Sequence, residues 1–378
     1  MPVITNIEDL RQLARRKMPR AIFDYVDRGS YDEITYAANS SELKAIRFRQ
    51  RVLLDATDRA LTTTMLGETV SMPVAIAPTG LTGLVHGDGE MLAARAAENF
   101  GTKYTLSTMS ICSIEDVRSV TKKPFWFQLY VFRDRGFSES VIARAREAGC
   151  TALFVTVDLP LRGQRHADLK NRLEVPPKLT LKNALNIAMK PDWALKVLMG
   201  RRKSFGNIDA YLKNKGGVWA AGAWANDNFD STLSWRDVEW VRKLWPGKLV
   251  LKGILDAEDA KTALSVGADA LVVSNHGGRQ LDGAPATITV LPEIVDAIGD
   301  KMDVLFDGGV RSGQDVLKAL ALGARGCMIG RAYLYGLGAM GEAGVTKALS
   351  LIRDELRVSM SLTGLKDVRE ASRSILYR

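Results

Sequence analysis

Residues 274–283 bring together residue types that can bind a small acid and accept a proton from it. They follow an apolar run at 270–273, rich in β-branched residues, which is typical of a buried parallel strand. His276 can exchange a proton near neutral pH, and Arg279 can hold a carboxylate through two parallel hydrogen bonds. A hydrogen-bonded cap at a strand end would explain an isolated histidine equally well, so the rest of the chain must decide.

Eight short apolar runs alternate with amphipathic stretches, which predicts a parallel sheet with crossover helices. Each run but one is followed directly by a predicted helix, so we expect a single (β/α)8 barrel domain over residues 1–378. An open, doubly wound sheet is the alternative. An amphipathic helix capped by Thr5-Asn6 should precede the barrel, and one over 341–357 should close it. The eight runs are 74–77, 104–106, 125–129, 153–157, 249–251, 271–273, 304–306 and 327–329.

The ends of these runs carry the candidate site residues. In a (β/α)8 barrel the active site lies at the C-terminal ends of the strands. Every predicted strand is followed by small or polar residues, and eight such ends would supply one ligand site. These residues are Pro78, Thr79, Gly80, Ser107, Gln128, Tyr130, Thr156, Asp158, Lys252, Ser274, His276, Asp307, Gly308, Gly309, Gly330 and Arg331.

The last two strand ends indicate a phosphate. Gly308 and Gly309 precede Arg311, and Gly330 precedes Arg331, each at a turn that leads into a helix. Glycine lets backbone N–H groups approach a ligand, and a helix start favours negative charge. The loops after strands seven and eight are a frequent phosphate site in barrels.

A long insertion at 160–232, after strand four, interrupts the alternation. Its segment 178–215 has nine Lys or Arg and two Asp, a net +7 of the chain's +9, interleaved with aliphatic residues and Trp193. This composition predicts a peripheral membrane-surface element, in which Arg202 and other basic residues meet anionic lipid and Trp193 enters the headgroup boundary. A solvated lid is the alternative, and nucleic acid is disfavoured because no recognised binding motif is present.

The composition indicates the size of the domain and the cellular compartment of the protein. The 378 residues suffice for one large domain. The three cysteines are widely spaced, which fits a reduced, cytoplasmic compartment and argues against a zinc site, so no metal is expected. No apolar run is as long as a membrane-spanning helix requires.

The chain resembles the FMN-dependent α-hydroxy acid dehydrogenases and oxidases over nearly its whole length. The most specific match is the signature at 274–282. Within the family, the bacterial membrane-associated L-lactate dehydrogenases are the most similar. The other matching stretches are 78–80, 105–108, 127–130, 133–137, 156–158, 206–208, 228–230, 252–253 and 307–309.

The resemblance implies a role for each candidate residue. His276 would be the catalytic base, oriented by Asp158. Arg165 and Arg279 would hold the substrate carboxylate, and Tyr25 and Tyr130 would add hydrogen bonds. In the FMN site, Lys252 would lie beside the flavin N1/C2 carbonyl. The phosphate would be bound by Gly308, Gly309, Arg311, Gly330 and Arg331. The other residues of the FMN site would be Pro78, Thr79, Gly80, Ser107, Gln128, Thr156, Ser274 and Asp307.

The implied activity is oxidation of an L-2-hydroxy acid, L-lactate to pyruvate, with electrons passed to a membrane quinone or cytochrome. The implied setting is a homotetramer on the cytoplasmic side of the bacterial inner membrane. Gly80 resembles the dehydrogenases, and Met109 leaves room for a substrate larger than glycolate. Three alternatives stay open: oxidation of L-mandelate or another 2-hydroxy acid, a soluble oxidase that makes hydrogen peroxide, and a flavin-free enzyme with a Schiff base at Lys252.

Overall fold

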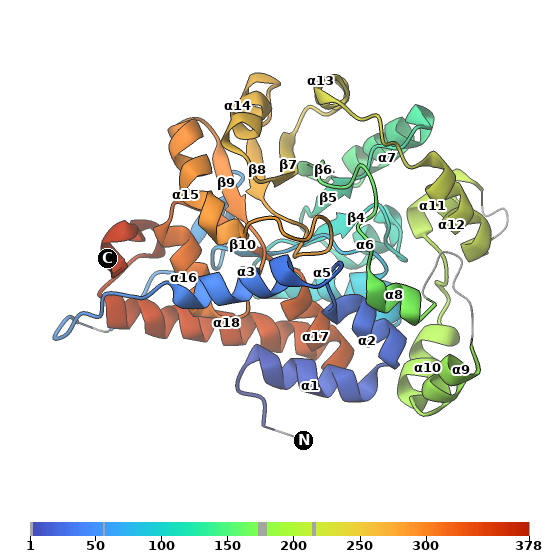
Figure 1. Ribbon diagram of the computed structural model, residues 1–378, viewed down its shortest axis with the longest axis horizontal. Coiled ribbons are helices and arrows are strands. Elements are labelled where there is room, and N and C mark those ends of the chain that lie inside the picture. The colour runs from blue at the N-terminus through green and yellow to red at the C-terminus, as the bar shows by residue number, and fades with distance from the viewer. Residues whose placement is uncertain (1–2, 56, 173–179, 214–216, 378) are drawn as a thin grey trace.

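The computed structural model describes residues 3–55, 57–172, 180–213 and 217–377 and shows a barrel of eight parallel strands (Figure 1). The strand order is β3-β10-β9-β8-β7-β6-β5-β4, and a parallel bridge between Ile76 and Tyr104 joins its two ends. The sheet therefore closes on itself, and the open-sheet alternative is wrong. The strands are β3 (Val74–Ile76), β4 (Thr105–Ser107), β5 (Trp126–Leu129), β6 (Ala152–Thr156), β7 (Lys248–Ile254), β8 (Ala270–Val273), β9 (Asp303–Phe306) and β10 (Gly326–Ile329).

Helices surround the barrel in the expected alternation, and all eight predicted strands lie within a few residues of their predicted positions. The predicted closing helix at 341–357 extends further in the structure, to Thr363. The helices after the strands are α4 (Thr82–Val85), α5 (Gly89–Phe100), α6 (Ile114–Val120), α7 (Arg135–Glu147), α13 (Trp235–Leu244), α14 (Ala257–Ser265), α15 (Thr287–Ile298), α16 (Gly313–Ala321), α17 (Arg331–Met340) and α18 (Glu342–Thr363).

A small antiparallel hairpin, β1 (Thr63–Met65) and β2 (Glu68–Val70), was not predicted. Its strands have three residues each, too few to produce a periodic pattern. Glu68 accepts hydrogen bonds from Trp126 Nε1 at 2.8 Å and Thr151 Oγ1 at 2.7 Å. Because these residues stand at or just before the starts of β5 and β6, the hairpin covers the N-terminal end of the barrel.

Helices α2 (Arg20–Asp27) and α3 (Ile34–Ala45) lie over the opposite end, and α1 (Ile7–Lys17) packs against α17. The predicted cap of α1 is confirmed, since the Asn6 side chain accepts from Asp9 N at 2.9 Å. Helix α3 fixes the loop between β8 and α15. Asn39 exchanges amide hydrogen bonds of 2.8 Å with Asn275, and the Asp282 carboxylate accepts from Thr35 N at 2.9 Å.

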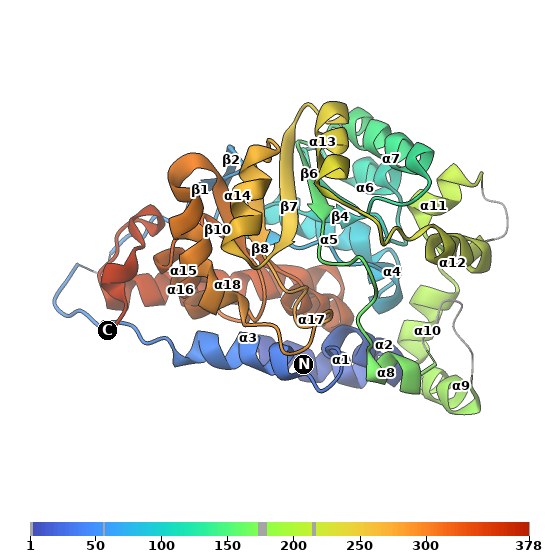
Figure 2. The ribbon, with the colours of Figure 1, turned by 45° about the horizontal axis from the view of Figure 1, so that its top comes forward.

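The insertion between β6 and α13 is helical in its described part, and Figures 1 and 2 show it to one side of the barrel. Residues 178, 179, 214 and 215 of the predicted surface segment lie outside the described residues. The insertion helices are α8 (His166–Lys170), α9 (Leu181–Ala188), α10 (Pro191–Leu198), α11 (Gly206–Tyr211) and α12 (Gly217–Asn228).

Two expectations about side chains of the insertion are wrong. Trp193 points into the protein, where its Nε1 donates to Leu84 O at 2.8 Å. Arg202 forms ion pairs with Asp88 at 2.8 Å and Asp116 at 2.7 Å. The indole ring and this guanidinium therefore attach the insertion to the barrel and are not directed outward.

Candidate active site

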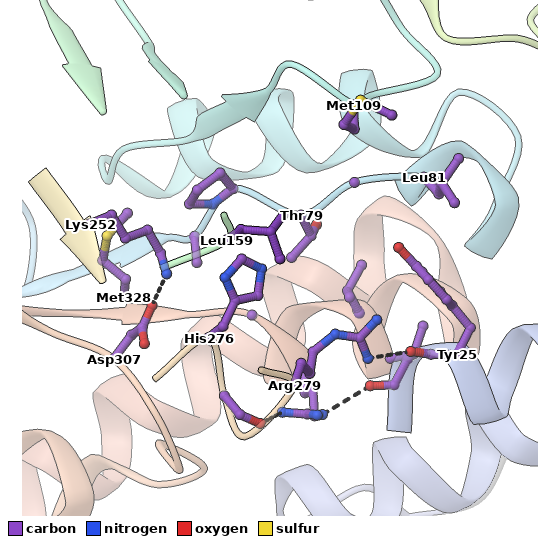
Figure 3. Close-up of a pocket in the computed structure, with 18 of the residues that line it drawn as sticks. Tyr25, Thr79, Leu81, Met109, Leu159, Lys252, His276, Arg279, Asp307 and Met328 are labelled. Carbon is purple, nitrogen blue, oxygen red and sulfur yellow. Dashed lines mark hydrogen bonds and ion pairs between the residues drawn. The ribbon is translucent and has the colours of Figure 1, made fainter. Parts of the chain in front are cut away.

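A cavity of about 180 Å³ lies at the C-terminal ends of the strands (Figure 3). Helix α2 contributes Tyr25 to its wall, so the N-terminal helices complete a site that the barrel begins. Most of the predicted site residues line this cavity. They are Tyr25, Pro78, Thr79, Gly80, Tyr130, Arg165, Lys252, His276, Arg279, Asp307, Gly308, Gly309, Arg311, Gly330 and Arg331.

His276 and Asp158 form a hydrogen-bonded pair at the cavity. His276 Nδ1 lies 2.9 Å from Asp158 Oδ1, and the His276 backbone has φ of +56°, a strained conformation for a residue with a side chain. A Cβ on Gly253 would lie 2.5 Å from Asp158 Cβ, so the glycine permits this approach. The pair therefore depends on two unusual backbone positions.

Electrostatics favours neutral His276 beside ionised Asp158. Burial lowers the pKa of His276 below 6.5, and the attraction of Asp158 compensates for this only in part. Burial opposes ionisation of Asp158, but its interactions with His276 and Lys252 outweigh burial, so its pKa stays below the ordinary value. With Nδ1 directed at a carboxylate, the other ring nitrogen of a neutral imidazole can accept a proton.

Two arginines line the same cavity. Arg279 Nη1 donates to the backbone carbonyls of Tyr25 at 2.6 Å and Arg28 at 3.0 Å, and its guanidinium lies over the Tyr25 ring. Burial lowers the pKa of Arg165 to about 10, and the nearby Arg279 contributes to this decrease. A carboxylate bound between the two guanidinium groups would relieve their repulsion.

Lys252 is a buried cation with two partners. Its Nζ lies 2.8 Å from Asp307 Oδ2 and donates to Ser274 Oγ at 2.8 Å. Burial opposes the charged form, but Asp307 and Asp158 outweigh burial, so the pKa of Lys252 is raised. The ammonium group therefore stays charged beside the cavity, and Asp307 acts here as its counter-ion.

The predicted phosphate turns form a cradle of backbone. Gly308 and Gly309 have φ of +102° and +89°, and a Cβ on Gly309 would lie 2.2 Å from Asn39 O. Arg331 is half-buried and already donates to three carbonyl oxygens, of Val26, Gly277 and Arg28. Its pKa falls to about 10, chiefly through burial, and the charges of Arg279 and, less strongly, Arg311 add to the decrease. An anion here would be stabilised by two cations and by exposed backbone N–H groups.

Four predicted flavin contacts are buried beside the cavity rather than among its lining residues. They are Ser107, Gln128, Thr156 and Ser274. Ser107 Oγ donates to Gln128 Oε1 at 2.9 Å, and Gln128 Nε2 has no hydrogen-bond partner among the described residues. A buried amide donor without a partner is costly, so it fits a ligand that offers an acceptor. Together with Lys252 and the glycine cradle, it fits a flavin mononucleotide.

The sequence did not identify the apolar part of the cavity wall. Leu81, Leu159, Phe205, Ala225 and Phe229 line the cavity, in addition to Met109. Phe205, Ala225 and Phe229 come from the insertion, where apolar residues have no spacing that distinguishes a pocket wall from a helix core. Only the packing of the insertion against the barrel mouth shows their position.

Comparisons with known proteins agree with this geometry. The model of a family described as FMN-dependent dehydrogenase matches residues 14–378. The chain belongs to the FMN-dependent dehydrogenase family. It is 48% identical to an L-lactate dehydrogenase of Caulobacter vibrioides, over 99% of this chain and 98% of the relative. FMN is accordingly the cofactor of this chain, and the flavin-free alternative is wrong.

Two solved structures are also similar. A monotopic membrane protein, (S)-mandelate dehydrogenase, superposes with a TM-score of 0.95 and 36% identity, over 100% of both chains. A soluble mutant of the membrane-associated (S)-mandelate dehydrogenase from Pseudomonas putida gives a TM-score of 0.84 and 36% identity, over 99% of both chains.

Replacing His276 should separate cofactor binding from reaction. We expect His276→Gln to retain FMN, because the phosphate cradle is untouched, and to reduce the flavin at least about a hundredfold more slowly. Anaerobic stopped-flow bleaching with L-lactate measures the rate, and absorbance after gel filtration measures the FMN retained. The control is Leu81→Met on the apolar wall, which should react almost normally. Near-normal reduction by His276→Gln would exclude His276 as the proton acceptor.

The pH dependence tests the His276–Asp158 pair. Because the pKa of His276 lies below 6.5, kcat/KM should hold steady near neutral pH and fall only below that value as the imidazole is protonated. Asp158 raises the pKa of His276, so Asp158→Asn should move the acid limb to lower pH while slowing reduction. An acid limb above 6.5, or a shift to higher pH in Asp158→Asn, contradicts this assignment.

Proposed function

We propose that this protein oxidises an L-2-hydroxy acid, L-lactate to pyruvate, and passes the electrons to a membrane quinone or cytochrome. The observation that carries the proposal is a neutral His276, hydrogen-bonded to the ionised Asp158, in one cavity with the carboxylate-binding pair Arg165 and Arg279. A base and a carboxylate anchor together select a substrate that has an acidic group next to the carbon to be oxidised.

The roles of the residues follow from this arrangement. Arg165 and Arg279 hold the carboxylate, and the Tyr25 and Tyr130 hydroxyl groups complete its hydrogen bonds. Burial raises the pKa of Tyr130, so its hydroxyl group keeps its proton and can donate it. His276 accepts a proton from the substrate, and Asp158 stabilises the imidazolium that forms. When bound, FMN would supply the acceptor for the two electrons and for the second proton that the oxidation releases. Lys252 holds a positive charge beside it, and the cradle at 308–309 binds its phosphate with Arg311, Gly330 and Arg331.

L-Lactate is favoured by the full-length similarity to bacterial L-lactate dehydrogenases at 48% identity. An aryl substrate such as L-mandelate is the second candidate, and a specific observation favours it. Met109, Phe205, Ala225 and Phe229 give the cavity an apolar wall, and similar solved structures are of mandelate dehydrogenase. The phenyl ring of L-mandelate could pack against such a wall, whereas the methyl group of L-lactate does not need so large an apolar surface.

Parallel kinetics with two substrates and two acceptors test the activity. We expect L-lactate to reduce the flavin with a higher kcat/KM than L-mandelate, and a soluble quinone to reoxidise it faster than oxygen does. Anaerobic stopped-flow mixing with each substrate measures the rate of flavin reduction. Mixing the reduced enzyme with air-saturated buffer or with quinone measures the rate of flavin reoxidation by each acceptor. A preference for L-mandelate would change the substrate, and reoxidation by oxygen at the turnover rate would make the protein an oxidase that produces hydrogen peroxide.

The insertion supports peripheral membrane binding on the cytoplasmic face. Helices α9 and α10 and the residues beside them expose large apolar side chains, which are Leu181, Leu185, Met189, Leu195, Leu198 and Met199. Lys190, Lys196, Arg201 and Lys203 stand among or next to them in the chain and supply positive charge that would attract anionic lipid. No helix in the described part of the chain is long and apolar enough to cross a membrane. The homotetramer implied by the family resemblance remains a prediction.

Removing apolar area from this surface should release the enzyme from membranes. We expect the triple variant Leu195→Ser, Leu198→Ser, Met199→Ser to stay in the supernatant when wild type sediments with phosphatidylglycerol vesicles, and to reduce its flavin normally. The control is Val52→Ser with Leu53→Ser, two exposed apolar residues outside the insertion. If both variants sediment like wild type, the insertion is only a lid.

A further inference from the structure

A second cavity, of about 160 Å³, lies where the insertion meets the barrel. Its walls come from the end of α1, from the residues after α4, from α10 and from the junction of α17 with α18. Val85, Trp193, Val197 and Met340 make part of its wall apolar. It is separate from the flavin cavity, since the residues that line the two cavities do not overlap.

Three basic side chains converge on this second cavity: Lys17, His86 and Lys196. The lysines are exposed and stand at its mouth, and His86 is half-buried. Burial lowers the pKa of His86, and Lys196 and Lys17 lower it further, whereas the Gly87 carbonyl and Asp88 oppose the decrease. His86 is therefore neutral near neutral pH, and the positive charge that would stabilise an anion bound there comes from Lys17 and Lys196.

The orientation of His86 leaves one ring nitrogen available. Its Nδ1 donates to Gly87 O at 2.9 Å, so Nε2 of the neutral ring is a hydrogen-bond acceptor, and a Cβ on Gly341 would stand 3.2 Å from Nε2. Gly341 has φ of +64°, and its lack of a side chain keeps the space beside Nε2 open. Asp192 also lines the cavity, so the ligand must offer a hydrogen-bond donor as well as an anionic group.

We propose that this cavity binds the phosphate and the polar headgroup of a glycerophospholipid, with Lys17 and Lys196 on the phosphate and with His86 Nε2 and Asp192 accepting hydrogen bonds from headgroup hydroxyl or ammonium groups. The inference rests on the proposed membrane association and extends it to a defined site. Lys196 lies between Leu195 and Leu198 on α10, whose exposed apolar side chains would accompany the acyl chains. A free phosphate ion would use neither Asp192 nor this apolar surface.

The two parts of the site are fixed to each other. Lys190, at the start of α10, donates from Nζ to Arg16 O at the end of α1, and Trp193 anchors α10 to Leu84. Figures 1 and 2 show α1, α2, α9 and α10 together on one side of the molecule. The headgroup site and the apolar surface therefore face the membrane together.

Vesicle sedimentation of the FMN-loaded full chain tests the site. We expect Lys17→Gln with Lys196→Gln to weaken binding to phosphatidylglycerol vesicles about tenfold more than Arg16→Gln with Arg201→Gln does. The second pair also removes one charge from the end of α1 and one from the insertion, but neither of its residues lines the cavity. Diffuse attraction to the membrane therefore cancels in the comparison, and the difference reports on the cavity.

Chemical protection provides a measurement without substitutions. Phosphatidylglycerol vesicles should slow the acetylation of Lys17 and Lys196, read by mass spectrometry, and leave the exposed Lys122 unaffected. Equal losses in the two double variants, or equal protection by inorganic phosphate without vesicles, would overturn the headgroup site while leaving membrane binding intact. If wild type fails to sediment at all, the proposed membrane association fails and the headgroup site fails with it.

Discussion

The site depends on keeping buried side chains charged at the barrel mouth. Asp158, Lys252 and Asp307 are largely removed from solvent, and burial alone would favour the neutral forms of Asp158 and Lys252. Lys252 between the two carboxylates keeps its proton, and Asp158 stays ionised opposite His276. Because this balance leaves His276 neutral, one arrangement of buried charges supplies both a fixed cation and a proton acceptor.

The N-terminal helices are part of this arrangement. Tyr25 on α2 lies under the Arg279 guanidinium, and the backbone carbonyls of Tyr25 and Arg28 accept its hydrogen bonds. The amide exchange between Asn39 and Asn275 fixes the loop that carries His276. Residues more than 200 positions away in the chain therefore orient the two groups that would meet the substrate.

The insertion has two faces with different consequences. Phe205, Ala225 and Phe229 close the flavin cavity from its apolar side, whereas α9 and α10 expose large apolar side chains outward. Trp193 attaches the insertion to the barrel through Leu84, and Arg202 does so through Asp88 and Asp116. A membrane that contacts α9 and α10 would therefore touch the same insertion that closes the flavin cavity.

The barrel and most of its site were predictable from the sequence, because strand ends are marked locally. An apolar run followed by Asp158, Lys252, His276 or Asp307 defines both the strand and the side of the barrel on which the polar residue lies. These signals depend only on neighbours in the chain. They could therefore be recognised before any tertiary contact was known, and the resemblance to a family added roles to positions already selected.

Tertiary structure decided what neighbours in the chain cannot encode. Three features depend on groups that are distant in sequence. Trp193 points inward, Asp307 pairs with Lys252, and Arg331 donates hydrogen bonds to backbone carbonyls. The same holds for the convergence of Lys17, His86 and Lys196 on one cavity. Sequence composition states which side chains carry charge or apolar area, but only packing decides which of them face solvent, a ligand or one another.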